Sequence, residues 1–195
     1  SELCKLYSGY SWHHKVIVVD NRFISERVNQ IRNWNIEYFN GDILDKDFVK
    51  MHFKDADIVH HLAGITDVPR TKSQSDLEKD RQIKIVAEKG TQNILDVIND
   101  KCKIIFPSTH VVYEGINKVK TDIKEEENTQ PVLSYSSSKA FNEKQLKESG
   151  KNYVILRLGS VYGYSNDTMR IDIMPNLFSK ICLLYTSPSP RDPHL

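Results

Sequence analysis

The sequence has few cysteines, no excess of charge of one sign and no long apolar run. Its three cysteines form no CxxC pair, which excludes a disulfide framework and favours free thiols in a reducing compartment. Lysine and arginine number 27 against 26 acids, so no net field attracts nucleic acid or an anionic membrane. No apolar run approaches the roughly 20 residues of a membrane helix. We therefore expect a cytoplasmic protein without nucleic-acid or membrane partners.

Both ends of the chain are unusual. The first residue is Ser1 instead of methionine. Near the other end, Cys182 to Asp192 carries two prolines among serines, which a disordered linker would explain. The same residues also match the translation, in one reading frame, of the DNA adapter used in transposase-based sequencing libraries. We expect residues 181–195 to be a non-native tail of this kind, residues 1–180 to be part of one domain, and a C-terminal substrate domain to be missing.

Short β-branched or aromatic runs alternate with segments of helical periodicity. The expected strands lie at 16–19, 36–39, 58–62, 103–106 and 153–156. Apolar residues at helical spacing lie between them, for example from Ile83 to Val97, and a further helix is expected from Ser138 to Glu148. Alternation of this kind predicts an α/β fold with a doubly wound parallel sheet.

Acidic residues follow the first two expected strands, at Asp20-Asn21 and at Asp42-Ile43. In a dinucleotide fold, an acid at a strand tip accepts hydrogen bonds from the adenosine ribose and repels a 2′-phosphate, which favours NAD over NADP. Asp42 could accept the adenine amino group while Ile43 packs on the ring. Alternatively, these acids have only a structural role, because acids commonly end strands and cap the next helix.

The third expected strand ends in two histidines followed by small residues. Ala63 and Gly64 would let a cofactor approach the backbone. His60 and His61 are adjacent and should point to opposite faces of a strand, so they cannot converge on one ion. We therefore expect no metal site and assign these histidines to packing.

The most informative pair is Tyr135 and Lys139, since only one of the nine tyrosines has lysine four residues later. On a helix the two side chains share a face, and the ammonium would lower the pKa of the phenol from about 10 toward neutrality. Such a phenol can act as a general base on an alcohol. Ser108 and Thr109 follow the fourth expected strand, where a hydroxyl could bind the substrate oxygen. As a lone motif, this pair is more often a helix cap or turn.

Together these segments resemble the extended short-chain dehydrogenases/reductases, the NAD-dependent epimerase/dehydratases, from Ser1 to about Gly163. The resemblance implies a Rossmann-like fold that lacks its first strand and its GxxGxxG loop here. It also implies NAD and nucleotide-sugar binding, and a homodimer for the intact enzyme. By the same resemblance, the catalytic residues are Thr109, Tyr135 and Lys139. The cofactor-binding residues would be Asp20, Asn21, Asp42, Ile43, Leu62, Ala63, Gly64, Ser108, Tyr135 and Lys139, and the substrate-binding residues Thr109 and Ser160.

Four positions depart from the family pattern. His110 and Val111 stand where dehydratases carry an acid after the threonine, which argues against a 4,6-dehydratase. Ala87 and Ser160 each stand where an asparagine is frequent, which leaves the substrate open.

The leading hypothesis is a nucleotide-sugar epimerase that works by transient hydride transfer. A reductase or dehydrogenase of the same family and a non-catalytic NAD-sensing module are the alternatives. Without the glycine-rich loop, we expect the 195 residues alone to bind NAD feebly and to aggregate. In the family strand order 3-2-1-4-5-6, the first strand lies at the centre of the sheet. Because that strand is missing here, we also expect either a gap between the second and fourth family strands or direct pairing of these two strands.

Overall fold

A computed structural model describes residues 2–8, 14–66, 76–163 and 174–184. The chain divides into two units, Ser1–Leu158 and Gly159–Leu195, which are described separately. The helices are α1 (Glu2–Ser8), α2 (Ser25–Asn33), α3 (Lys46–Phe53), α4 (Leu77–Ile85), α5 (Thr91–Val97), α6 (Ser134–Glu148) and α7 (Met174–Leu184), with a π-helical turn at Val86–Gly90 and a 3-10 turn at His110–Tyr113. The strands are β1 (Ile17–Asp20), β2 (Glu37–Asn40), β3 (Ile58–His60), β4 (Lys103–Thr109) and β5 (Asn152–Leu158).

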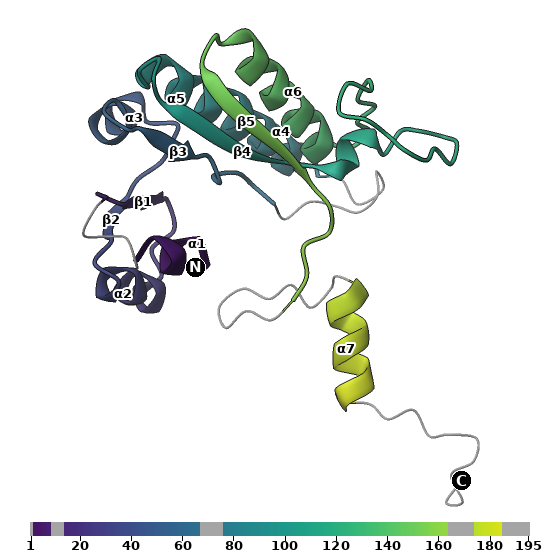
Figure 1. The fold of residues 1–195 in the computed structure, drawn as a ribbon, viewed down its shortest axis with the longest axis horizontal. Coiled ribbons are helices and arrows are strands. Elements are labelled where there is room, and N and C mark those ends of the chain that lie inside the picture. Colours follow the sequence, from purple (N-terminus) through teal and green to yellow (C-terminus); the bar gives the residue numbers. More distant parts are fainter. Residues whose placement is uncertain (1, 9–13, 67–75, 164–173, 185–195) are drawn as a thin grey trace, which may run out of the picture. The chain divides into compact units, whose positions relative to one another are not determined.

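The strands of the first unit form two parallel sheets, β1-β2 and β3-β4-β5 (Figure 1). The first pairs Ile17 with Glu37, and the second pairs Val59 with Ile104. All five strands lie where the sequence predicts them, and the parallel sheets with flanking helices confirm the Rossmann-like fold. Among the described residues β1 and β3 are not paired, so the expected gap is present.

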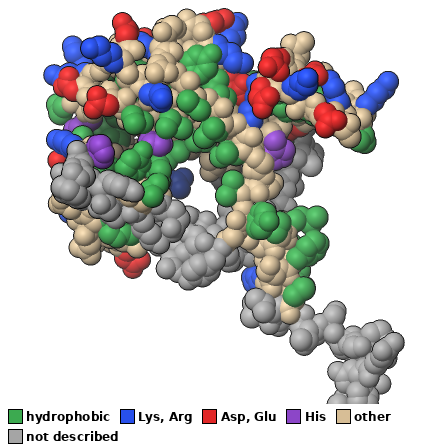
Figure 2. All heavy atoms as spheres, viewed as in Figure 1, with side chains coloured by type: hydrophobic (Ala, Val, Ile, Leu, Met, Phe, Trp, Pro, Cys, Tyr) green, Lys and Arg blue, Asp and Glu red, His purple; other side chains and the backbone are tan. Residues whose placement is uncertain are grey.

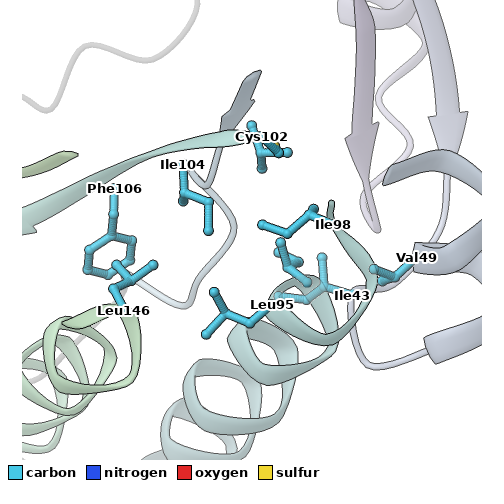
Figure 3. Close-up of a cluster of buried hydrophobic side chains, with 10 residues drawn as sticks. Ile43, Val49, Leu95, Ile98, Cys102, Ile104, Phe106 and Leu146 are labelled. Carbon is cyan, nitrogen blue, oxygen red and sulfur yellow. The ribbon is translucent and has the colours of Figure 1, made fainter. Parts of the chain in front are cut away.

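The core lies between the three-stranded sheet and its helices. Phe106 and Ile104 of β4 point toward Leu146 of α6 and Leu95 of α5 (Figure 3). The cluster continues through Ile98, Cys102, Val49 and Ile43. A Cβ at Gly90 would lie 2.3 Å from Ile43 Cδ1, so only glycine allows the π-helical turn to approach Ile43 this closely.

The side chains of β5 alternate between the two faces of its sheet. Arg157 and Ile155 face the core side, where Arg157 meets α6. Val154, Leu156 and Leu158 alternate with them and are exposed, so the other face is apolar and open within the described residues. In the space-filling view, hydrophobic side chains gather on the visible face of this unit, and charges of both signs mix around them (Figure 2).

The second unit contributes α7, in which Asn176 accepts a hydrogen bond from the backbone N–H of Gly163 at 3.1 Å. In the described parts of both units, no helix has the length and apolar character needed to cross a bilayer.

Candidate active site

Tyr135 and Lys139 lie one turn apart at the start of α6. The Lys139 ammonium donates a hydrogen bond to the Pro107 carbonyl at 2.9 Å. It lies 4.4 Å from the centroid of the Phe106 ring and 5.9 Å from that of Tyr135. The structure therefore places the tyrosine and lysine on one side of the helix, facing the carboxyl end of β4, as the sequence predicts.

The surroundings of Lys139 are mostly apolar. Burial lowers the pKa of its ammonium to about 8. Across the described residues no ion pair of Lys139 is found, and its positive charge meets only aromatic faces and one carbonyl. The ammonium thus remains available to stabilise an anion that forms beside it.

Thr109 ends β4, two residues after the carbonyl that holds Lys139. It is 9% exposed, and its Oγ1 accepts a hydrogen bond from the backbone N–H of Val111 at 3.3 Å. This bond starts the 3-10 turn and fixes the side chain at the end of the strand. The hydroxyl proton of Thr109 is not used in this contact.

Ser108 differs from the sequence expectation. Its hydroxyl donates to Glu143 Oε1 at 2.6 Å in the core, so its proton is engaged and cannot bind a substrate oxygen. Of the two hydroxyls at the end of β4, only Thr109 keeps that role. A cofactor contact of Ser108 stays a prediction, and it would have to use the oxygen as an acceptor.

Sequence reasoning missed a buried ion pair behind these residues. Glu143 of α6 is 2% exposed and binds Arg157 of β5, with Nη2–Oε2 at 2.6 Å and Nε–Oε1 at 3.0 Å. Arg157 also donates to the Glu125 carbonyl at 2.8 Å and to the Tyr113 hydroxyl. Burial raises the pKa of Glu143, but the hydrogen bonds from Arg157 and Ser108 outweigh it and lower the pKa. The spacing from Lys139 to Glu143, one more helical turn, was the available signal.

Glu114 holds the start of α6. The helix begins after Leu133, which has no polar side chain with which to cap it. Instead, Glu114 Oε1 accepts hydrogen bonds from the N–H groups of Val132 and Leu133, both at 2.7 Å, and from the Ser136 hydroxyl. Partial burial raises the pKa of Glu114, and these hydrogen bonds more than reverse that effect and lower it.

Asn21, directly after β1, meets Asp42, which follows β2, at one sheet edge. Asn21 Nδ2 donates to Asp42 Oδ2 at 3.2 Å, while Asp20 Oδ1 accepts from the Arg22 N–H at 2.8 Å. Asp42 Oδ1 also accepts the N–H of Leu44. The helix caps expected as the alternative are not formed by these acids, because α2 follows Ile24 without a side-chain cap and Asp45 caps α3. Asp20 and Asp42 instead form local turns. They leave the carboxylates at the exposed carboxyl end of parallel strands, where nucleotides bind in this fold class.

Ile43 has a partner that the sequence did not indicate. The sequence assigned its side chain to an adenine ring, but the structure places it in the core, 7% exposed and packed against Gly90. The apolar contacts that Ile43 could offer a ring are taken by the protein itself. A cofactor role of Ile43 remains only as a prediction for its backbone or its small exposed edge.

The segment after β3 is open. Leu62, Ala63 and Gly64 are exposed, and a Cβ at Gly64 would have nothing within 4 Å. Small residues here leave room for a ligand to lie along the backbone. This space and the carboxylates after β1 and β2 fit an adenine dinucleotide. The residues that would hold it are Asp20, Asn21, Asp42 and Leu62 to Gly64.

The two histidines of β3 have different partners. His60 Nε2 contacts the Tyr7 hydroxyl of α1 at 2.8 Å, and His61 Nε2 contacts the Thr91 hydroxyl at 2.8 Å. Burial, followed by the nearby charge of Lys139, lowers the pKa of His61 to about 4, so His61 is neutral at physiological pH. Their geometry is that of packing residues.

Two further positions singled out in the sequence follow β4 and β5. His110 Nδ1 lies 3.1 Å from the Leu158 carbonyl oxygen and bridges the ends of β4 and β5. Ser160 belongs to the second unit, so its predicted substrate role stays a prediction.

A model of the "NAD dependent epimerase/dehydratase family" matches residues 1–182. The chain belongs to this family. A curated member, 3beta-hydroxysteroid-dehydrogenase/decarboxylase isoform 2 of Arabidopsis thaliana, is 27% identical over 143 residues, which make up 68% of this chain and 24% of that protein.

Solved structures of the family share the fold. A tyrosine-to-phenylalanine mutant of UDP-glucuronic acid 4-epimerase from Bacillus cereus, in complex with NAD and a fluorinated UDP-sugar, is 22% identical, with a TM-score of 0.72 over 93% of this chain and 59% of that one. UDP-glucose 4-epimerase of Thermotoga maritima, with UDP-glucose, is 22% identical, with a TM-score of 0.70 over 91% and 58%. A dTDP-glucose 4,6-dehydratase double mutant from Streptomyces venezuelae is 19% identical, with a TM-score of 0.67 over 93% and 57%. The chain thus spans less than two thirds of these relatives.

Proposed function

We propose that the protein carrying this chain is an NAD-dependent epimerase that acts on a carbinol of a nucleotide sugar. The observation that carries the proposal is the Lys139 ammonium, 5.9 Å from the Tyr135 ring and bonded to β4 two residues before Thr109. A phenol, an unpaired ammonium and a hydroxyl at one strand end make up the set that alcohol oxidation requires.

Each side chain has one task in this mechanism. Tyr135, as phenolate, takes the proton of the sugar hydroxyl, and Lys139 stabilises the phenolate. Thr109 donates a hydrogen bond to the sugar oxygen and orients it. NAD, when bound, would supply the hydride acceptor for the oxidation at this carbon and the hydride donor for the return to the epimer. Tyr135 then gives its proton back, so the sugar leaves as its epimer.

The adenosine half of NAD would lie over the edge formed by β1 and β2. Asp20 would accept hydrogen bonds from the ribose and repel a 2′-phosphate. Asp42 would accept the adenine amino group. The family name and the NAD in the Bacillus cereus complex support this choice of cofactor. The homodimer expected for the intact enzyme remains a prediction.

The curated relative favours a second candidate, an NAD-dependent dehydrogenase. That relative acts on a hydroxysteroid by its name, and the same three residues would oxidise a steroid alcohol without returning the hydrogen.

Product analysis on the whole protein separates the two candidates. The protein is incubated with NAD and either a panel of UDP- and dTDP-sugars or a 3β-hydroxysteroid. The proposal expects conversion of one sugar to its epimer without net production of NADH. Net NADH production with the steroid would replace the epimerase by the dehydrogenase. Binding of NAD without conversion of any substrate would leave only a cofactor-sensing module.

A further inference from the structure

Two consecutive residues of β4 are tied to α6 immediately before Thr109. The Pro107 carbonyl accepts from Lys139 at 2.9 Å, and the Ser108 hydroxyl donates to Glu143 at 2.6 Å. Lys139 and Glu143 are one turn apart on α6, and Tyr135 lies one turn before them. Any slide of the helix along the strand would break both contacts, so together they fix where Tyr135 stands relative to Thr109.

The Glu143 contact is unusually well anchored. Its carboxylate receives the Ser108 hydroxyl from β4 and the Arg157 guanidinium from β5, the latter at 2.6, 3.0 and 3.2 Å. Arg157 in turn binds the Glu125 carbonyl at 2.8 Å. The buried carboxylate of α6 therefore joins β4 and β5, and a loop carbonyl holds its Arg157 partner.

A buried ion pair of this kind is not explained by stability alone. Well-packed apolar residues of similar volume often serve as well or better, because two charges must lose their hydration. What apolar residues cannot supply is the directional bond to Ser108. The pairing with Arg157 also compensates the charge of Glu143, which leaves the Lys139 ammonium without a carboxylate partner in the part of the chain that the structure describes.

We propose that Glu143 is a positioning residue of the active site. It acts through the Ser108 hydroxyl to hold Thr109 at the distance from Tyr135 and Lys139 that the reaction requires, and Arg157 holds Glu143 in turn. This inference rests on the proposed function, since it assigns Glu143 to the same proton transfer.

The test uses Ser108→Ala and Glu143→Gln in the whole protein with NAD and its sugar substrate. Ser108→Ala removes only the link to β4, and Glu143→Gln keeps the shape of the side chain and loses its charge. Glu143→Asp checks rescue, and Glu148→Gln, an exposed glutamate of α6, is the matched control. Melting temperature, the NAD dissociation constant, kcat and KM are measured for each.

A positioning role expects Ser108→Ala to lower kcat on the order of 10²-fold, as for a misplacement of about 1 Å. KM should stay within about twofold, and the protein should remain fully folded at the assay temperature, although loss of a hydrogen bond to a buried carboxylate lowers its melting temperature. Glu143→Asp should recover part of the kcat that Glu143→Gln loses. Wild-type kcat in both Ser108→Ala and Glu143→Gln would overturn the positioning role and leave the proposed function intact. A kcat loss fully explained by unfolded protein would overturn it as well. A wild-type protein without turnover would overturn both proposals.

Discussion

The charge of Lys139 is held in place by a few specific contacts. Its ammonium touches a carbonyl, the face of Phe106 and the ring of Tyr135. Because burial lowers its pKa to about 8, the side chain is charged at neutral pH and loses its proton just above it. A phenolate beside Lys139 is stabilised only while that proton is present.

This titration should appear in the pH profile. We expect kcat/KM of the whole protein to fall as pH rises through about 8, because the neutral amine no longer stabilises the phenolate. Arginine stays protonated at all accessible pH values, so Lys139→Arg should move the falling limb to higher pH, with a lower maximal rate. If kcat/KM fell at the same pH in both proteins, the group that titrates would be a residue other than Lys139.

Local spacing in the sequence predicts the placement of single residues, while their chemical roles stay predictions. The four-residue spacing of Tyr135 and Lys139 and the position of Thr109 after a strand are examples. For Ile43 and Ser108 the structure shows core contacts that the sequence did not indicate, because their partners come from distant segments. Gly90 lies 47 residues after Ile43, and Glu143 lies 35 residues after Ser108. No local sequence pattern reveals whether a side chain will face the core.

Helix α6 depends on a distant residue for its first turn. Glu114 satisfies the N–H groups of Val132 and Leu133 and also binds Ser136. Tyr135 lies between these contacts. Loss of the carboxylate would leave the first turn of the helix, and with it the phenol of Tyr135, less ordered.

Glu114→Ala is therefore expected to have two effects. The free energy of unfolding of the whole protein should fall by about 1 kcal/mol, as for loss of a helix N-cap, and kcat should fall because Tyr135 is less well placed. Chemical denaturation and steady-state kinetics measure the two effects. Glu126→Ala, in the preceding loop, is the control. If Glu114→Ala matched that control in both measurements, the helix start would not depend on Glu114.

Strands were easier to predict than the details of helices. The β-branched runs at Val16 to Val19 and Lys103 to Phe106 fixed two strands to within a few residues. The apolar spacing from Ile83 to Val97 indicated one helix, but the structure interrupts it with the π-helical turn at Val86–Gly90. The interruption lies where Gly90 meets Ile43, a tertiary contact that periodicity does not encode.

Across the first unit, the described strands form two separate sheets with open edges at β1 and β3. The 195 residues also contain no GxxGxxG run, the loop that binds the pyrophosphate of a dinucleotide at a helix N-terminus. The contacts described above for the adenosine half of NAD would therefore lack the support of contacts to the pyrophosphate.

The 195-residue chain alone should bind NAD weakly. In calorimetric titration we expect no saturation at NAD concentrations that saturate the whole protein. We also expect aggregation, because Val154, Leu156 and Leu158 expose one face of the sheet. Replacing Leu156 by lysine should reduce light scattering, whereas lysine at the partly buried Ile155 should not. Tight NAD binding by the isolated chain would contradict this expectation.

The most direct test of the proposed chemistry is one turnover of the whole protein with and without the Tyr135 hydroxyl. The protein is mixed with NAD and its sugar substrate, and the absorbance of the reduced nicotinamide is followed in wild type and Tyr135→Phe. If Tyr135 takes the sugar proton, the variant should bind NAD normally and reduce it about 10²- to 10⁴-fold more slowly. Equal rates in the two proteins would show that this phenol is not the base.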